Sequence, residues 1–192
     1  SETKGNEPFV KMISDENKRL EILVERILQS AVIDRGELKL KSESLNLSKI
    51  IEQIVSNAKF RLEGLEGEIQ LNLPEEDVHI TGDRVHITNI ISNLVDNAIK
   101  YSKKDPLIKV DLVKKGAGYD LNIQDHGIGI PKEHLNKIFD KLYIVPTGNV
   151  HNVKGFGLGL SYVKAIVDLN KWNISVKSKL NEGSTFTLII PT

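Results

Sequence analysis

The most regular pattern of apolar positions lies near the start of the chain. From Phe9 to about Lys41, seam positions alternate at steps of four and three residues, at Ile13, Asn17, Leu20, Val24, Ile27 and Ala31. This spacing is typical of a helix that packs in a bundle or coiled coil. An ordinary amphipathic helix lying on its own domain is the alternative. The seam predicts a partner helix, and no matching helix follows nearby in the sequence.

Beyond this helix, helix-like and strand-like segments alternate. Apolar residues at helical spacing predict helices over 47–59, with Ser48 as N-cap, and over 83–100, 131–139 and 158–170. Alternating patterns predict strands over 68–73, 78–80, 107–115, 119–124, 172–179 and 184–190, the last four forming two hairpins. Residues 1–8 are predicted to be a loop. We expect a mixed sheet covered on one face by helices, an α/β two-layer sandwich preceded by a long helix.

Composition narrows the possible partners. Lys plus Arg and Asp plus Glu each number 26, so no basic excess attracts nucleic acid or an acidic membrane surface. The absence of cysteine excludes disulfides, thiolate metal sites and cysteine nucleophiles, and fits a reducing compartment. No apolar run approaches the ~20 residues that span a bilayer. We therefore expect a soluble chain that contacts neither nucleic acid nor membrane.

The helix over 83–100 carries the first candidate chemistry. At ~100° per residue its polar side chains share one arc, and Ile87, Ile91, Leu94, Val95 and Ala98 fall on the other side. The arc contains His86, Asn89, Asn93, Asp96, Asn97 and Lys100. Two carboxamides and an ammonium at i, i+4 and i+7 can hold a metal ion and phosphate oxygens. Taken alone, the same pattern also describes a solvated helix face.

Two glycine-rich segments favour the phosphate interpretation. In residues 125–129, Asp-x-Gly-x-Gly lets the backbone pass close beneath a flat ligand while the carboxylate accepts hydrogen bonds from it. In residues 155–160, three alternating glycines precede a helix whose free amides and dipole attract an anion. This second segment lacks the Gly-Lys-Ser/Thr ending of a P-loop and does not follow the first strand of a dinucleotide fold. The 15 residues between Phe139 and Gly155 predict a lid over the nucleotide.

In this order and spacing, these motifs resemble the catalytic ATP-binding domain of sensor histidine kinases. The resemblance rests on the Asn93-x-x-x-Asn97 helix, the Asp-x-Gly-x-Gly turn, Phe139 before the lid, the Gly-x-Gly-x-Gly-Leu loop and the Gly183-Ser-Thr-Phe strand. It covers residues 46–192 and implies the Bergerat-type fold shared with gyrase and a heat-shock chaperone. Residues 1–45 resemble the second helix of the family's dimerisation and histidine phosphotransfer domain, which accounts for the seam without a partner.

The resemblance also implies roles for individual residues. Asp125 would accept from the adenine amino group, Tyr101 would pack near the base, and Asn97 would offer its side-chain oxygen to Mg²⁺. Lys100 would neutralise phosphate charge as a catalytic residue together with Asn93. The full nucleotide-binding set is Asn93, Asn97, Lys100, Tyr101, Asp125, Gly127, Gly129, Gly155, Gly157, Leu158, Gly159 and Leu160. Asn93 stands where the gyrase and chaperone branches carry a water-activating glutamate, and a carboxamide cannot take that proton.

The implied function is transfer of the ATP γ-phosphate to a histidine, for relay to an aspartate of a response regulator. The five histidines are His79, His86, His126, His134 and His151. None lies in the first helix, and the family's acceptor sits on the helix before it, so we expect Mg-ATP binding without autophosphorylation in cis. The resemblance further implies a homodimer through the phosphotransfer helices, and a cytoplasmic position in a protein of the bacterial plasma membrane.

Three departures from the family's pattern keep alternatives open. Ile144 stands where the family often has an arginine that reaches the phosphates, His126 replaces an asparagine, and Phe156 replaces a small residue. The main alternative is therefore a degenerate ATP-gated interaction module, or a phosphatase of the response regulator with little kinase activity. A hydrolytic ATPase of the chaperone type is disfavoured by Asn93.

Overall fold

The computed structural model describes residues 7–62, 66–102, 104–146 and 156–191, in two compact units that divide between Lys39 and Leu40. The first unit contains helix α1 (Glu7–Asp34), so residues 7 and 8 belong to the helix and not to the predicted loop. The prediction that α1 continues to Lys41 was wrong. The chain turns at Gly36, whose φ of 67° ends the helix in the left-handed conformation that glycine adopts without strain. Exposed apolar side chains run along α1, among them Ile13, Leu20, Val24 and Ile27.

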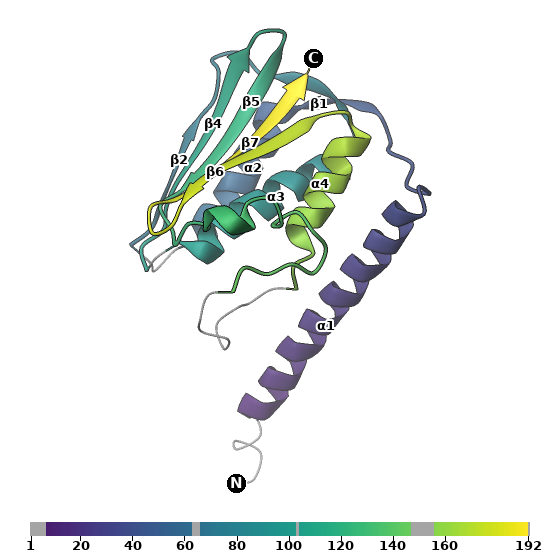
Figure 1. Ribbon diagram of the computed structural model, residues 1–192, viewed down its shortest axis with the longest axis vertical. Helices are drawn as coiled ribbons and strands as arrows, with labels where there is room; N and C mark the ends of the chain where they lie inside the picture. Colours follow the sequence, from purple (N-terminus) through teal and green to yellow (C-terminus); the bar gives the residue numbers. More distant parts are fainter. Residues whose placement is uncertain (1–6, 63–65, 103, 147–155, 192) are drawn as a thin grey trace. The chain divides into compact units, whose positions relative to one another are not determined.

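A five-stranded mixed sheet forms the centre of the second unit (Figure 1). Its strands are β2 (Glu68–Asn72), β4 (Leu107–Lys115), β5 (Gly118–Asp125), β7 (Gly183–Pro191) and β6 (Asn173–Lys179), in that order across the sheet. β2 and β4 are parallel, and the other neighbours are antiparallel. Both predicted hairpins, β4–β5 and β6–β7, are confirmed. A parallel pair needs a crossover, and the chain between β2 and β4 supplies one.

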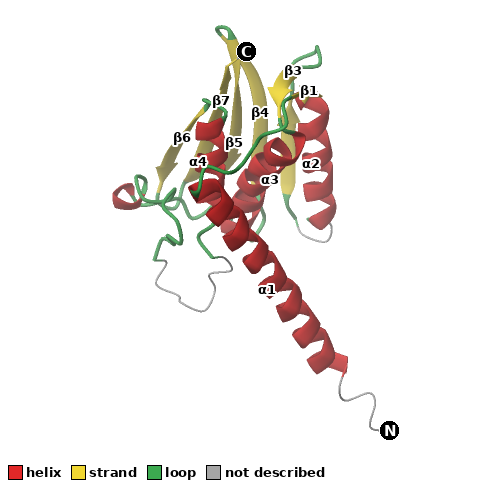
Figure 2. Cartoon of the chain, turned by 90° about the vertical axis from the view of Figure 1, so that its right-hand side faces the viewer, coloured by secondary structure: helices red, strands yellow, loops and turns green. Residues whose placement is uncertain are grey.

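Three helices cover one face of this sheet (Figure 2), as predicted. They are α2 (Leu47–Arg61), α3 (Arg84–Tyr101) and α4 (Gly159–Leu169), and α3 packs against both of the others. Strand residues that point toward the helices, such as Leu121 and Ile123, are buried together with Ile87, Ile91 and Leu94 of α3. Each fully buried side chain of this size contributes about 1.5–3 kcal/mol. The two-layer α/β sandwich therefore follows from the predicted period-2 and period-3.6 patterns.

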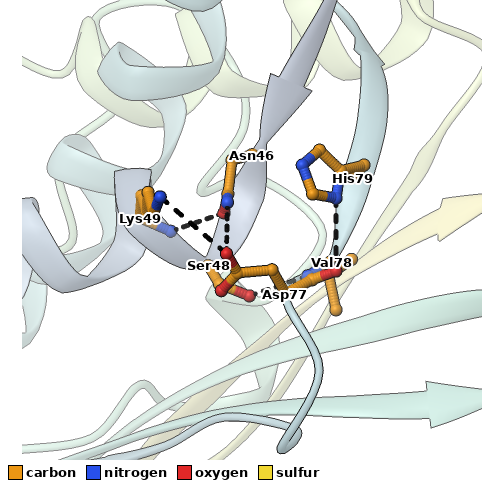
Figure 3. Close-up of polar contacts among 6 residues, drawn as sticks. All are labelled: Asn46, Ser48, Lys49, Asp77, Val78 and His79. Atoms are coloured by element: carbon orange, nitrogen blue, oxygen red, sulfur yellow. Dashed lines mark hydrogen bonds and ion pairs between the residues drawn. The ribbon is translucent and has the colours of Figure 1, made fainter.

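A second, smaller sheet was not predicted. It pairs β1 (Glu43–Asn46) with β3 (His79–Gly82) in antiparallel register, so the strand predicted over 78–80 lies outside the main sheet. Asn46 is the N-cap of α2, because its Oδ1 accepts from the Lys49 amide at 3.0 Å (Figure 3). The prediction of Ser48 as N-cap was wrong, since its Oγ accepts from the Val78 amide at 3.0 Å. Asn46 Nδ2 also donates to Asp77 Oδ2 at 2.7 Å, so both polar side chains join α2 to the segment that enters β3.

The start of α3 is fixed by a single carboxylate. Asp83 is the N-cap, and its Oδ1 accepts from the amides of Val85 and His86 at 3.0 and 3.2 Å. Its Oδ2 accepts from the Lys41 amide at 2.8 Å. Burial alone would raise the pKa of Asp83, but the three backbone donors, together with the charge of His86, outweigh it and hold that pKa below its ordinary value. This residue therefore ties the segment before β1 to the first turn of α3.

The segment after β5 differs from its prediction. The helix predicted over 131–139 is only a 3-10 helix, Lys132–His134, followed by turns. Its short i→i+3 bonds, such as the Leu135 amide to the Lys132 carbonyl at 3.3 Å, do not extend into a regular helix. In the part of the chain that the structure describes, no helix is both long and apolar enough to cross a membrane.

Candidate nucleotide-binding site

A cavity lies between the end of α3, the turn after β5, the start of β7 and the segment that precedes residue 147. Thirteen residues line it: Asn97, Tyr101, Asp125, Ile128, Gly129, Ile130, Ile138, Tyr143, Ile144, Val145, Leu160, Ser184 and Phe186. Five of these residues belong to the predicted nucleotide-binding set, although they come from three separate parts of the sequence: Asn97 and Tyr101, Asp125 and Gly129, and Leu160. The fold thus brings residues from all of these motifs around one mainly apolar cavity.

Asp125 is the buried acidic group of this cavity, and the residue is only 5% exposed. Its Oδ1 accepts from the amides of Gly127 and Ser184, at 2.8 and 3.2 Å. Burial raises the pKa of Asp125, against the lowering effect of these two bonds and of the nearby His126. No fully buried side-chain N or O atom among the described residues lacks a partner. Because Oδ2 has no bond to these residues, it must be reachable from the cavity, where it can accept from a ligand.

Close backbone packing explains the glycines of the turn after β5. A Cβ on Gly127 would lie 2.1 Å from the carbonyl oxygen of Tyr101, and one on Gly129 would lie 2.0 Å from that of Lys179. The Ile128 amide donates to the Tyr101 carbonyl at 3.0 Å, and the Ile128 carbonyl accepts from the Asn181 amide at 2.7 Å. The turn is therefore held between the end of α3 and the β6–β7 hairpin, with Asp125 at its start.

The polar residues of α3 divide between two faces. Asn97 and Tyr101 line the cavity, and Lys100 donates from Nζ to the Tyr101 hydroxyl at 2.9 Å. Asn93 lies outside the cavity lining, where its Nδ2 donates to the Asn89 carbonyl at 2.8 Å. Asp96, at the edge of the predicted arc, does not line the cavity. Asp96 pairs with Arg61 of α2 at 2.6 Å, on the side of α3 that faces α2.

The second glycine segment leads into α4. Residues 147–155, including Gly155 and most of the predicted lid, lie outside the described residues. Gly157 has a φ of 68°, and a Cβ there would lie 2.5 Å from the backbone carbonyl carbon of Leu142. Leu158 precedes the helix and has no side-chain cap to offer, so the first amides of α4 are available to a ligand. A Cβ on Gly159 would lie 2.9 Å from Asn93 Oδ1, which places Asn93 beside the helix N-terminus.

Sequence reasoning missed most of the apolar wall of the cavity. Ser184 and Phe186 reach it because β7 alternates, burying Ser184, Phe186, Leu188 and Ile190 on its inner face. That alternation was visible in the sequence. The contributions of Ile128, Ile130, Ile138, Tyr143 and Val145 were not, since they depend on how two irregular segments pack.

Two of the departures from the family's pattern lie differently with respect to the cavity. Ile144 lines it directly, so an apolar side chain occupies this part of the wall. His126 does not line it, and its Nδ1 instead lies 3.2 Å from the Leu107 carbonyl at the start of β4. A second histidine contacts the wall indirectly, because His134 Nδ1 lies 2.6 Å from the Tyr143 hydroxyl.

The described residues contain no group of three or more His, Cys, Asp or Glu side chains that could hold a metal ion. The predicted Mg²⁺ site needs only one protein oxygen. Asn97 lines the cavity and supplies a carboxamide oxygen, the kind of hard donor that Mg²⁺ accepts when phosphate oxygens and water fill its other positions. The donor set thus fits a metal ion that arrives with a nucleotide.

Comparison with known proteins agrees with this geometry. Residues 82–192 match the family described as histidine kinase-, DNA gyrase B- and HSP90-like ATPases. The sensor protein RprX of Bacteroides fragilis is 43% identical over 182 residues, covering 94% of this chain and 35% of that protein. The chain spans about a third of the length of the first curated relatives it matches.

Solved structures show the same fold. The histidine kinase AdeS of Acinetobacter baumannii superposes with a TM-score of 0.79 at 25% identity, over 96% of this chain and 84% of that one. The histidine kinase ThkA, crystallised in complex with the response regulator TrrA, superposes with a TM-score of 0.76 at 22% identity, over 100% of this chain and 52% of that one. The chain belongs to the histidine kinase-, DNA gyrase B- and HSP90-like ATPase family, as the ATP-binding catalytic domain of a two-component sensor histidine kinase.

Proposed function

We propose that this chain binds Mg-ATP and donates the γ-phosphate to a histidine of a phosphotransfer helix, for relay to an aspartate of a response regulator. The observation that carries the proposal is Asp125, a buried carboxylate in an apolar cavity with one oxygen open to a ligand. An exocyclic amino group is the donor that such an oxygen selects. Ser184, whose amide bonds the same carboxylate, is added to the predicted adenine contacts.

The triphosphate extends from the base toward the first turn of α4. Asn97 would hold the Mg²⁺, which would neutralise phosphate charge, and Lys100, whose Nζ bonds the Tyr101 hydroxyl, would add a second positive charge. The amides of residues 157–160 bind phosphate oxygens at a helix N-terminus, where the dipole favours anions. Most of the catalytic effect then comes from positioning and charge stabilisation. The glycine segment of residues 155–160, including Gly155, is part of the proposed phosphate-binding site.

In the transfer step, a nitrogen of the acceptor histidine forms a bond to the γ-phosphorus while the bond to the β,γ-bridging oxygen breaks. ADP leaves with that electron pair, and the phosphoryl group stays on the histidine. Asn93 lies beside the start of α4 and carries no group that can deprotonate water. The lack of such a group at Asn93 favours transfer of the phosphoryl group to a protein acceptor over hydrolysis of ATP.

The domain organisation and partners form part of the same proposal. Residues 1–45 supply the second helix of a dimerisation and phosphotransfer domain, and residues 46–192 supply the catalytic domain. The exposed apolar stripe of α1 supports a homodimer formed through these helices in the whole protein. A response regulator receiver domain is the proposed second partner, as in the ThkA–TrrA crystal. The whole protein is proposed to reside in a bacterial plasma membrane, with this chain on the cytoplasmic side.

Calorimetric titration with ATP, with and without Mg²⁺, tests the site. We expect one nucleotide per chain, tighter binding with Mg²⁺, and no phosphohistidine on the chain after incubation with γ-labelled ATP. Adding a separate helix with an acceptor histidine should then yield acid-labile label on that helix. The absence of ATP binding would refute the proposal.

The second candidate is an ATP-gated interaction module or a phosphatase of the response regulator. Ile144 in the cavity wall favours it, because an apolar side chain there supplies no charge to the phosphates. Such a protein would bind ATP but leave the added helix unlabelled, so the same transfer assay separates the two functions.

A further inference from the structure

A hydroxyl from α4 joins two polar side chains of α3, outside the cavity described above. The Tyr162 hydroxyl lies 2.7 Å from His86 Nδ1, and it accepts from Asn89 Nδ2 at a longer 3.4 Å. The two rings are tilted by 36°, with centroids 6.2 Å apart. Burial raises the pKa of Tyr162, so the hydroxyl keeps its proton at neutral pH and can donate to His86.

This cluster is continuous with Asn93. Asn93 donates from Nδ2 to the Asn89 carbonyl at 2.8 Å, while its Oδ1 is directed to Gly159, the first residue of α4. Tyr162 stands three residues after Gly159 on the same helix. The hydroxyl therefore links α3 and α4 at Asn89, which is about one helical turn along α3 from Asn93, the residue beside Gly159.

The position along α3 indicates which part of a nucleotide this link would affect. Tyr101 and Asn97 line the cavity that contains Asp125, and Asn93, Asn89 and His86 follow at successive turns away from it. A nucleotide whose base contacts Asp125 would therefore have its terminal phosphate nearest Asn93 and the start of α4. A diphosphate is shorter by one phosphoryl group and would depend less on this end.

We propose that Tyr162 is a positioning residue for the terminal phosphate: by joining His86 and Asn89 to α4, it fixes the Asn93 carboxamide against the amides that begin α4. The inference rests on the proposed nucleotide site. The inference adds that the site selects the triphosphate over the diphosphate. This selectivity depends on the spacing of α3 and α4, and not on a direct contact of Tyr162 with the nucleotide.

The test is the affinity of the chain for ADP and for AMP-PNP, each with Mg²⁺, measured by calorimetry on wild type and Tyr162→Phe. The variant keeps the ring and loses only the hydroxyl. We expect the affinity for AMP-PNP to fall about three- to tenfold, the range set by one hydrogen bond, with ADP affinity changed by less than about twofold. His86→Ala should have the same selective effect, and the double variant should show less than the sum of the two losses.

Thr187→Val is the matched control, because it also removes a hydroxyl bonded to an asparagine. Thr187 Oγ1 donates to Asn122 Oδ1 at 2.7 Å on the sheet face away from the helices. It should leave both affinities unchanged. Equal losses for ADP and AMP-PNP in Tyr162→Phe, or no loss for either, would overturn the inference while the nucleotide site itself stands. Failure of wild type to bind either nucleotide would instead refute the proposed function.

Discussion

The backbone amide of Leu142 donates a hydrogen bond of 3.0 Å to the carbonyl of Gly157, across 14 intervening residues of the sequence. Both residues have positive φ, 61° at Leu142 and 68° at Gly157. The contact joins the segment that provides Tyr143, Ile144 and Val145 to the segment that begins α4. The apolar wall of the cavity and the proposed phosphate-binding amides are thus fixed to each other by backbone alone.

Gly157→Ala is expected to disrupt this junction. A left-handed residue with a side chain costs about 1–2 kcal/mol, and the added Cβ would also lie 2.5 Å from the Leu142 carbonyl carbon. We expect weaker ATP binding and a lower melting temperature. Gly116→Ala is the matched control, because Gly116 has a φ of 59° but open space around its Cβ position. Equal effects of the two substitutions on ATP affinity would contradict a specific role for the junction.

Asp125→Asn should separate binding from stability. The amide keeps an oxygen for the Gly127 and Ser184 donors, but it replaces the open acceptor with a donor, so we expect the ATP affinity to fall at least about tenfold, or 1.4 kcal/mol. Since the folded-state pKa of Asp125 is raised, its contribution to stability is present at low pH and is lost as the pH rises through that pKa. Urea unfolding should therefore show the variant gaining stability relative to wild type between acidic and neutral pH. A difference in unfolding free energy that does not change with pH would contradict the conclusion that ionisation of the buried Asp125 carboxyl destabilises the fold.

Asp83→Asn should show the opposite pH dependence. The folded-state pKa of Asp83 is lowered, so its contribution is present above the ordinary carboxyl pKa and is lost as the pH falls through the folded value. An asparagine still caps α3, and the advantage of wild type over the variant should shrink in acid. Asn46→Ala, which removes the uncharged cap of α2, should cost about 1 kcal/mol without such a pH trend. The measurement is the urea midpoint from neutral pH down to pH values below the ordinary carboxyl range. A parallel trend in both variants would exclude Asp83 as the source of the pH dependence.

Asn97→Ala should remove much of the Mg²⁺ dependence of ATP binding. The substitution deletes the one protein oxygen proposed for the metal, while Asp125 and the apolar wall still hold the base. Calorimetric affinities with Mg²⁺ and with a chelator should converge in this variant. Asn57→Ala is the control, because Asn57 lines a separate groove between α2 and α3. If Asn97→Ala keeps the full Mg²⁺ effect, another group holds the metal.

The site was predictable as far as its motifs carry local signals. Asp125 and the glycines around it stand out in the sequence, because only glycine fits where a Cβ would collide with the backbone. At Gly127 that Cβ would meet the Tyr101 carbonyl oxygen. Asn97 stands out by its helical spacing. The partner of Asp96 was not predictable, because helical periodicity gives an angle but does not say which neighbour a polar side chain meets. In the fold that neighbour is Arg61 of α2.

Local physics in the sequence by itself determined the type and order of nearly every helix and strand, since alternation and helical spacing record which side of each element is buried. The family motifs added the kind of ligand. Only the tertiary structure decided which residues share the cavity wall, that Asn46 and not Ser48 caps α2, and that the Tyr162 hydroxyl joins His86 to Asn89. Those relationships depend on contacts between segments far apart in the chain, and no local pattern encodes the distance between them.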